Sequence, residues 1–423
     1  MAQQNLISVE QARALLLDTI QTLDTETIPL IDAIGRISAK DQTSDIDISP
    51  FDHSAMDGFA VVASDLSAAT SDVPIDLPVI AEIPAGSFYD KVLQPGMCIR
   101  IMTGAPVPEG ADAVVKFEVV ENLENEGRAP GRVAFRAPVK VGENIRQKGE
   151  EIRAGEVAIG AGEPISPAGV GLLASCGLSE VEVHRRPRVT VIPIGSELVG
   201  PNILPKPGQI RDGNSYAIGA SVVRAGGIPL MHSIVPDDKE MLAKAILNAV
   251  EVSDFVVTSG GASNGDYDYI QQVVKEQGIL YMDFVNMRPG KAQTFGLINE
   301  TPVFGLSGNP AAAYCGFEML VRPALRKMQG YQTFDRPRTW APLSRTMQKK
   351  DSRRIYLRST LERLEDGGVQ VRPAKSQSSG LFSPFQSGNC LAILPEGVPE
   401  SQKVEAGTMV ECLLFDVDEG VVI

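Results

Sequence analysis

The chain has 423 residues, of which 43% are apolar and 22% are charged, and its formal net charge at pH 7 is −14. This length and composition predict a globular protein of two to four domains and exclude a mainly disordered chain. The acidic balance argues against an extended nucleic-acid interface, which needs basic patches, and no apolar run reaches the ~18 residues that would cross a bilayer.

The first predicted element is a helix over residues 8–20, where Ser8 and Gln11 have the spacing of a capping box. From about residue 28 to 165, short β-like runs are broken by Gly and Pro. This pattern predicts one or two β-rich modules. A second helix is expected over residues 166–176.

Strands and helices alternate from Arg188 onwards. The expected strands are RVTVIPIG, IPLMHSIV, DFVVTSGG, ILYMDFVNM and TPVFGL, and the expected helices are NSYAIGASVVRAGG, KEMLAKAILNAVEV, YIQQVVKEQG and the long NPAAAYCGFEMLVRPALRKM. This alternation predicts a parallel, doubly wound sheet. From about residue 331 short strands with polar turns return, which indicates a separate small β module. The fold class is therefore multidomain α/β plus β.

The segment from Asp254 to Asp268 carries the strongest functional signal. A buried strand is expected to lead into a loop of small residues and then into two carboxylates, Asp266 and Asp268. Small residues let backbone N–H groups approach an anion, and the carboxylates suggest a divalent metal shared with a phosphate group. The small residues of this loop include Ser259, Gly260, Gly261, Ser263 and Gly265.

Three loops follow strands of the expected sheet: GSEL at 195–198, SGGASNGDYD at 259–268 and SGNP at 307–310. The carboxyl ends of parallel strands meet at one sheet edge, where doubly wound folds bind their ligands. Pro310 suits the first position of the following helix, and we expect the free N–H groups of Ala311–Ala313 to form an anion site.

The turn MRPGK adds two cations, Arg288 and Lys291, on either side of Pro289 and Gly290. Guanidinium and ammonium groups suit an oxyanion such as phosphate or a metal oxyanion. The alternative is a solvated basic turn, but the surrounding region is acidic, which favours a pocket that both cations face.

Other signatures are weaker. GASNG at 261–265 fits a nucleophile elbow, but no histidine follows His232, so a hydrolase triad lacks its base. GVGLLA at 169–174 has no preceding strand, which argues against a dinucleotide site, and no Walker A sequence occurs. Asp57–Gly58 and Thr103–Gly104 read by themselves as turns.

The N-terminus has no basic region followed by an apolar run, so no signal peptide is expected. The five cysteines are odd in number, far apart and never spaced as CxxC. A disulfide framework and a structural zinc site are therefore not expected, and a cytoplasmic location is.

Taken in order, these segments resemble the molybdopterin molybdenumtransferase family, which includes MoeA and the E domain of gephyrin. The resemblance covers nearly the whole chain. It rests on SAMDGFAV, IRIMTGAPVPEGADAVV, VGENIRQKGEEI, GSELV, GQIRDGNSY, SGGASNGDYD, MRPGKAQTFG, GLSGNP and SSGLFSPFQSGNCLAILPEG. Each segment is weak by itself, whereas the ordered set is specific.

The resemblance implies a protein that inserts molybdenum from molybdate into adenylylated molybdopterin, with release of AMP and with Mg²⁺ or another divalent cation. It implies a homodimer whose active site lies between the doubly wound domain of one subunit and the β-rich N-terminal domain of the other. A molybdopterin adenylyltransferase is the partner that would deliver the substrate, and neither nucleic acid nor a membrane is expected.

The resemblance also implies four parts. These are a helical and β linker domain at 1–50 and 151–186, a β-rich domain inserted into it at 51–150, a doubly wound molybdopterin-binding domain at 187–330, and a C-terminal β domain at 331–423.

Carried over residue by residue, the resemblance assigns catalytic roles to Asp57, Thr103, Glu197, Asp237, Asp268 and Lys291. It assigns substrate binding to Arg146, Glu151, Ser259, Gly260, Gly261, Ser263, Arg288, Ser307, Gly308, Asn309, Arg353, Arg358 and Ser379. The implied metal ligands are Asp268, Asp266 and Glu197, and the choice between Asp266 and Asp268 as direct ligand stays open. Phe284 and Gln147 depart from the family pattern, because many members carry a basic residue there.

Two other functions could use the same fold: a catalytically decayed scaffold, and a nucleotide or pyrophosphate hydrolase. The carboxylates Asp57, Glu197, Asp237 and Asp268 are all present, which argues against decay. A hydrolase would not need the MTGA segment or the MRPGK turn.

Overall fold

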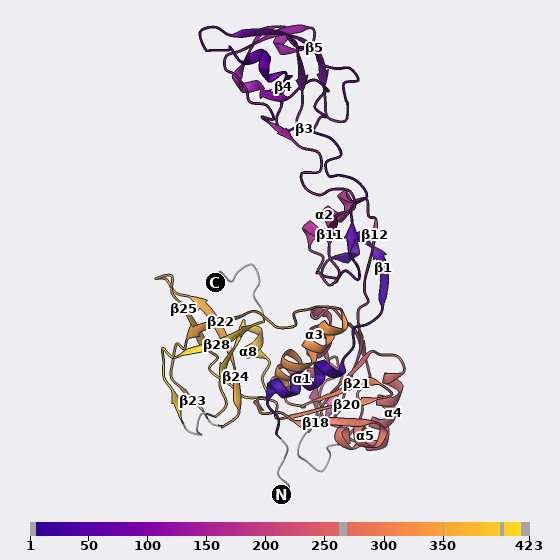
Figure 1. Ribbon diagram of the computed structural model, residues 1–423. Coiled ribbons are helices and arrows are strands. Elements are labelled where there is room, and N and C mark those ends of the chain that lie inside the picture. The colour runs from indigo at the N-terminus through magenta and orange to yellow at the C-terminus, as the bar shows by residue number, and fades with distance from the viewer. Residues whose placement is uncertain (1–5, 262–268, 350, 398–401, 416–423) are drawn as a thin grey trace. The chain divides into compact units, whose positions relative to one another are not determined.

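The structure is a computed structural model, and it describes residues 6–261, 269–349, 351–397 and 402–415. The chain divides into two compact units (Figure 1). Unit 1 comprises Met1–Glu26, Gly35–Ala39 and Val183–Ile423, and unit 2 comprises Thr27–Ile34 and Lys40–Glu182. The finer division into four parts stays a prediction.

Unit 1 is built on a six-stranded sheet of order β16-β13-β17-β21-β20-β18. Its strands are β13 (Arg188–Pro193), β16 (Ile228–Met231), β17 (Phe255–Ser259), β18 (Ile279–Phe284), β20 (Ala292–Ile298) and β21 (Thr301–Leu306). Strands β16, β13, β17 and β21 run parallel, and β20 runs antiparallel to β21 and β18. The predicted doubly wound sheet is confirmed, with β20 as an addition.

Strand β20 escapes the sequence pattern because its turn is unusual. It forms a hairpin with β21 through Asn299 and Glu300, whose φ angles are 48° and 64°. Two-residue hairpin turns with positive φ usually contain glycine. The dipeptide Asn-Glu therefore does not predict a hairpin.

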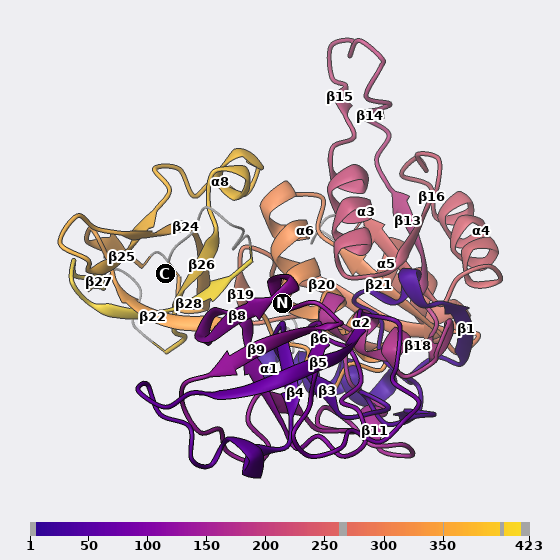
Figure 2. The same ribbon diagram turned by 90° about the horizontal axis from the view of Figure 1, so that it is seen from above.

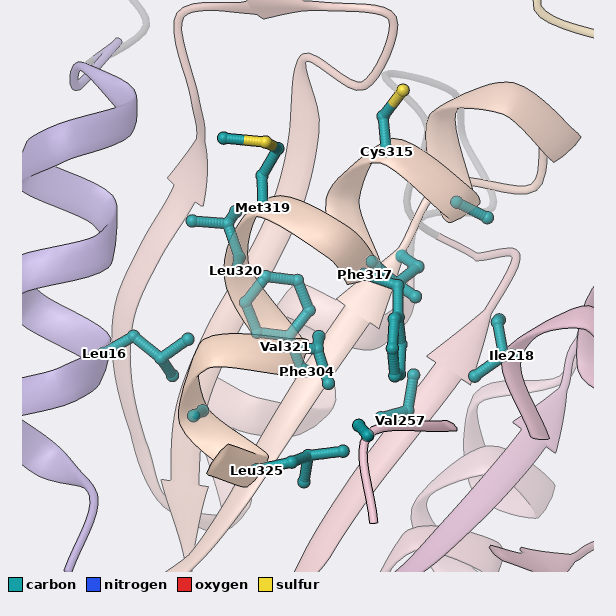
Figure 3. Close-up of a cluster of buried hydrophobic side chains, with 14 of the residues drawn as sticks. Leu16, Ile218, Val257, Phe304, Cys315, Phe317, Met319, Leu320, Val321 and Leu325 are labelled. Atoms are coloured by element: carbon teal, nitrogen blue, oxygen red, sulfur yellow. The ribbon is translucent and has the colours of Figure 1, made fainter. Parts of the chain in front are cut away.

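Helices cover both faces of this sheet. They are α1 (Val9–Thr19), α3 (Asn214–Arg224), α4 (Lys239–Val250), α5 (Tyr269–Gln277), α6 (Pro310–Gly316), the π-helix η5 (Phe317–Val321) and α7 (Arg322–Met328). On one face α4 and α5 lie side by side and bury Leu242 and Ile270 against Val256. On the other, α1, α3 and η5 contribute Leu16, Ile218 and Phe317 to a cluster with Val257 and Phe304 (Figure 3).

Local sequence explains where α1 begins and why the helix from α6 to α7 is distorted. Ser8 Oγ accepts from the Gln11 N–H at 3.1 Å, and the Ser8 N–H donates to Gln11 Oε1 at 2.9 Å, so the predicted capping box is confirmed. The predicted long helix is continuous from α6 to α7 but passes through the π-turn η5. Pro323, the second residue of α7, has no N–H to donate, so the hydrogen-bond ladder cannot continue unchanged through η5.

A second sheet of unit 1 has the order β19-β24-β26-β28-β22, and β25 pairs with β24. Its strands are β19 (Met287–Arg288), β22 (Arg338–Pro342), β24 (Arg354–Arg363), β25 (Val369–Pro373), β26 (Cys390–Leu394) and β28 (Met409–Leu414). The smaller elements of unit 1 are β14 (Leu198–Val199), β15 (Ile210–Arg211), β23 (Met347–Gln348), β27 (Lys403–Val404) and α8 (Ser383–Gln386). β14 and β15 pair in an arm that stands away from the sheet (Figure 2).

Unit 2 is built on a six-stranded sheet of order β7-β4-β6-β5-β9-β8. Its strands are β4 (Gly58–Val61), β5 (Ile75–Ile83), β6 (Cys98–Ile101), β7 (Ala113–Lys116), β8 (Val120–Glu124) and β9 (Gly131–Phe135). Phe59 and Phe135 are buried in its core with edge-to-face rings. The β-rich character predicted for this region is confirmed.

The remaining elements are short. They are β2 (Gln42–Thr43), which pairs with β11 (Val157–Ile159); β3 (His53–Ser54), which pairs with β10 (Ile145–Arg146); and the helices η1 (Leu30–Ala33), η2 (Ala63–Leu66), η3 (Phe117–Val119), η4 (Asn125–Gly127) and α2 (Pro167–Ser175). Strands β1 (Thr25–Pro29) and β12 (Glu180–His184) pair, and the boundary between the units falls inside both. In the described ranges, no helix has the length and apolarity needed to span a bilayer.

Candidate functional site

The loops after β13, β17 and β21 lie together at the carboxyl edge of the parallel strands. Ser259 at the end of β17 pairs with Pro193 of β13 and with Leu306 of β21. The side-chain amide of Asn214, at the start of α3, donates to Ser259 Oγ and to the Gly308 carbonyl, both at 2.9 Å. The structure thus brings together the described parts of the three predicted loops.

Gly260 permits this close approach. Its φ is +100°, and a Cβ there would lie 2.2 Å from the carbonyl oxygen of Ile194, so any side chain would collide with the neighbouring loop. Its N–H donates to the Leu306 carbonyl at 3.1 Å, so this donor already has a partner. The further predicted residues of this loop, Ser263, Gly265, Asp266 and Asp268, lie outside the described residues.

Glu197 and Asp237 lie on two loops that are tied to each other. Asp237 Oδ2 accepts from the Ser196 N–H at 2.8 Å, and Ser196 Oγ accepts from the Asp237 N–H at 3.0 Å. These reciprocal bonds hold the loop after β13, on which the Glu197 side chain is exposed. Asp237 therefore supports the loop that presents Glu197.

Asp57 and Thr103 meet in unit 2, although 46 residues separate them. Asp57 Oδ1 accepts from the backbone N–H and from the hydroxyl of Thr103, both at 2.7 Å. These two bonds hold the pKa of the Asp57 carboxyl below its ordinary value, and the bond from the backbone N–H has the larger effect. Both residues are exposed, so the two isolated turns of the sequence form one surface pair, in which a neutral threonine donates to an ionised carboxylate.

Arg146 and Glu151 also lie in unit 2 and are exposed. Arg146 is in β10 and pairs with His53 of β3, the strand that leads into the segment of Asp57. The Glu151 N–H donates to the Ile48 carbonyl at 3.1 Å. The backbone therefore places Arg146 next to the chain segment that carries Asp57.

A cavity of about 940 Å³ opens in unit 1 where the MRPGK turn meets the second sheet. Six of its described lining residues are Arg or Lys, and none is Asp or Glu. These cations are Arg288, Lys291, Arg345, Arg353, Arg358 and Lys375, and the predicted residues Ser307, Asn309 and Ser379 line the cavity as well. In a protein of net charge −14, such a wall concentrates anions locally.

The second sheet holds the basic turn in place. Strand β19, which contains Arg288, pairs in parallel with β24, where Ile355 lies opposite Arg288. Gly290 has φ +99°, and a Cβ there would lie 2.7 Å from Gln293 Nε2 and 3.2 Å from the Ala312 carbonyl oxygen. The turn therefore packs directly on the first turn of α6, and only glycine fits.

Asp351 orients two of the cations. Its Oδ2 lies 3.2 Å from Arg288 Nη1, and its Oδ1 accepts from Arg353 Nε at 2.8 Å. The hydrogen bonds from Arg353, above all, hold the pKa of Asp351 well below its ordinary value. One carboxylate shared by two guanidinium groups leaves a net positive charge here.

Arg358 is the most deeply buried cation of the cavity, with 2% of its surface exposed. Its Nη2 donates to the Ser378 carbonyl at 3.1 Å, whereas its Nε has no hydrogen-bond partner within the described chain. Burial lowers the pKa of the Arg358 guanidinium, but such a group stays charged at neutral pH. A buried guanidinium with an unused donor favours a bound anion.

The predicted anion site at Ala311–Ala313 is wrong. The Ala311 N–H donates to the Ser379 carbonyl at 2.8 Å, and the N–H groups of Ala312 and Ala313 both donate to the Asn309 carbonyl at 2.9 Å. Two of these donors start the helical ladder, and the third is taken by the C-terminal part of the chain. The bond from Ala311 to Ser379 joins distant segments of the chain, so the local sequence cannot reveal it.

Sequence reasoning missed Arg345 and Lys375 on the cavity wall and Asn214 between the loops. Arg345 Nη2 donates to the Ala374 carbonyl at 2.8 Å, so these two cations belong to adjoining segments. Lys375 lies four residues before the predicted Ser379, and Asn214 lies in the segment GQIRDGNSY. The sequence motifs could therefore have pointed to Lys375 and Asn214, whereas Arg345 lies in a turn that matches no motif.

A metal site is only partly covered by the structure. Among the residues described, no three His, Cys, Asp or Glu side chains gather closely enough to hold an ion. Of the three predicted ligands, Asp266 and Asp268 lie outside this range, and Glu197 is exposed on the adjacent loop. A set of carboxylate oxygens has the chemistry that suits Mg²⁺.

Family models match three successive parts of the chain. The model of the MoeA N-terminal region (domain I and II) matches residues 7–177, that of the probable molybdopterin binding domain matches 190–327, and that of the MoeA C-terminal region (domain IV) matches 341–415.

Relatives named molybdopterin molybdenumtransferase are similar to this chain over most of its length. Identity is 33% for the Bacillus subtilis protein over 94% of this chain and 91% of the relative, 34% for that of Staphylococcus aureus strain COL over 98% and 97%, and 37% for that of Nostoc sp. over 88% and 86%. A solved structure of the molybdopterin biosynthesis MoeA protein from Pyrococcus horikoshii is 30% identical, with a TM-score of 0.82 over 97% of this chain and 100% of the other. The chain therefore belongs to the molybdopterin molybdenumtransferase (MoeA) family.

Proposed function

We propose that this protein inserts molybdenum from molybdate into adenylylated molybdopterin and releases AMP and molybdenum cofactor. The names of the relatives support this reaction. The structural observation that supports it most is the cavity whose six charged lining residues are all cations. Both substrates are anions, and such a wall would bring them together against their mutual repulsion.

In this proposal the cavity binds the metal oxyanion. Lys291 and Arg288 would contact molybdate from the basic turn, and Arg358, Arg353 and Ser379 from the second sheet, because all five line one cavity. Guanidinium and ammonium donors form charge-assisted hydrogen bonds with oxyanions. The Nε of the buried Arg358, which has no hydrogen-bond partner among the residues described, supports its place in this set.

The adenylyl phosphate would lie at the strand-end loops. Ser307 and Asn309 line the cavity and follow β21 directly, so the cavity reaches this sheet edge. The other residues assigned to the nucleotide are Ser259, Gly260, Gly261, Ser263 and Gly308. Ligands of doubly wound domains bind at this edge.

We also propose Mg²⁺ or another divalent cation at Asp268 or Asp266, with Glu197 from the neighbouring loop. When bound, the cation would offset the charge of the phosphate groups. The protein's own contribution is the arrangement of the loops, because the Ser196–Asp237 bonds hold the segment of Glu197.

The active site would be shared between two copies of the chain. The ionised Asp57 beside Thr103, together with Arg146 and Glu151, would come from unit 2 of a second subunit in a homodimer. The exposure of all four side chains supports such a role.

The five cysteines are buried free thiols, which suits a reducing cytoplasm. There a molybdopterin adenylyltransferase would supply the substrate.

A single-turnover assay with adenylylated molybdopterin tests the proposal. AMP release should require molybdate and should accompany formation of molybdenum cofactor. Equal AMP release without molybdate would favour a nucleotide or pyrophosphate hydrolase. If the protein forms the homodimer normally but releases no AMP, a scaffold is favoured.

A further inference from the structure

Gln293 is a fully buried polar side chain behind the basic turn, and the proposed chemistry does not use it. It is the second residue of β20, and its exposed fraction is 0%. Its neighbours Lys291 and Ala292 line the cavity, whereas Gln293 does not. It therefore belongs to the layer that supports the cavity wall.

The carboxamide of Gln293 is lodged between the turn and α6. Its Nε2 donates to the Gly290 carbonyl at 3.1 Å. A Cβ at Gly316 of α6 would lie 2.6 Å from Gln293 Oε1, and a Cβ at Gly290 would lie 2.7 Å from Nε2. Both neighbours must be glycine for the amide to fit, so the contact depends on three residues together.

Glutamine is not the residue type that the stability of the fold alone would favour at position 293. Its Oε1 has no hydrogen-bond partner in the described ranges of the chain. A buried carbonyl without a partner is unfavourable, and an apolar side chain of similar size would remove that cost. The bond to the Gly290 carbonyl is what an apolar side chain could not provide.

That bond controls the backbone of Lys291 from one side. The Gly290 carbonyl and the Lys291 N–H belong to one rigid peptide plane. On the other side, the Lys291 carbonyl accepts from the Val285 N–H at 2.8 Å. Both peptide planes that flank Lys291 are therefore held by hydrogen bonds.

We infer that Gln293 is a positioning residue, which aims Lys291 and the rest of the basic turn into the cavity. Its effect on molybdate rests on the proposed function, whereas its effect on the turn does not. The turn can therefore be measured without a ligand, and the two ideas can fail separately.

The test compares Gln293→Met with Thr294→Val. Methionine keeps the length of the side chain and removes the donor. Thr294 is the next residue of β20, is 1% exposed, and its Oγ1 also has no partner among the described residues. Successive strand residues point to opposite faces, so Thr294→Val removes a buried polar group from the same strand without touching the turn.

Hydrogen exchange of the backbone amides of residues 285–292 is the first readout. In Gln293→Met we expect roughly two- to tenfold faster exchange in this peptide, the range that corresponds to one ordinary hydrogen bond. Thr294→Val should exchange at the rate of the unmodified protein. Unchanged exchange in Gln293→Met would overturn the inference, and so would equal acceleration in both variants. Gln293→Leu replaces Gln293→Met if the latter does not fold.

Molybdate affinity, measured by calorimetry, is the second readout. Gln293→Met should bind molybdate roughly two- to tenfold more weakly and AMP unchanged, and Thr294→Val should bind both normally. Lys291→Ala serves as the reference. If it binds molybdate normally, the proposed oxyanion site fails, and hydrogen exchange still decides the role of Gln293. If it binds weakly while Gln293→Met binds normally, the positioning role is overturned and the site stands.

Discussion

Replacing Lys291 by alanine is expected to weaken molybdate binding much more than AMP binding. Lys291 lines the cationic cavity, and its Nζ lies 5.5 Å from the centre of the Phe284 ring. Phe284 is 8% exposed, so the ammonium group stands against an apolar wall. An anion bound beside it would meet less competing water than at an open surface.

The size of the effect follows from one lost contact. A hydrogen bond to a charged group contributes about 1.5–3 kcal/mol, which corresponds to a loss of roughly ten- to hundredfold in affinity. The contact of Lys291 with Phe284 adds about 0.5–1 kcal/mol at such a site. Because that contact can persist in free and bound protein alike, it should affect stability more than affinity.

Calorimetric titration with molybdate and with AMP, each at low and high salt, measures the effect. Lys244→Ala is the matched control, because Lys244 is exposed on α4 and does not line the cavity. A general electrostatic role would weaken both ligands alike and disappear with added salt. That result, or equal behaviour of Lys291→Ala and Lys244→Ala, would refute the oxyanion role of Lys291.

Three further predictions concern the metal, the dimer and the fold. Asp268→Asn should remove most AMP release at saturating Mg²⁺ because an amide cannot balance a divalent cation, and normal turnover would transfer the role to Asp266. Mixing inactive Asp57→Ala and Asp268→Ala subunits should restore part of the activity, and no recovery after confirmed subunit exchange would contradict a shared site. Gly260→Ala should lower the free energy of unfolding by about 2 kcal/mol or more. Gly86→Ala, which has a positive φ but nothing within 4 Å of its Cβ, should lower it clearly less in the same urea titration.

The sequence determined the regular elements wherever local chemistry decides them. The capping box of Ser8 and Gln11 marks the start of α1, and Ser166 with Pro167 marks that of α2. Alternation of strands and helices from Arg188 predicts the doubly wound sheet, because such units pack in few ways. It also predicts that loops after parallel strands share one edge, as Asn214 confirms by bridging two of them.

Contacts between distant segments were beyond local reasoning. Asp57 and Thr103 read as separate turns, and only the sheet of unit 2 makes them partners. The N–H of Ala311 looks free until the chain returns with the Ser379 carbonyl. Strand β20 stayed hidden because its hairpin turn lacks glycine.

The cavity shows the same division. Arg288 and Lys291 could be assigned to an oxyanion from their residue types, since charge and hydrogen-bonding capacity belong to the side chain. Their arrangement with Arg345 and Lys375 in one wall depends on the pairing of β19 with β24. The support from Gln293 likewise requires two glycines, one in the turn and one in α6. Residue chemistry is local and can be read along the chain, whereas the placement of that chemistry depends on contacts that form only when distant segments pack.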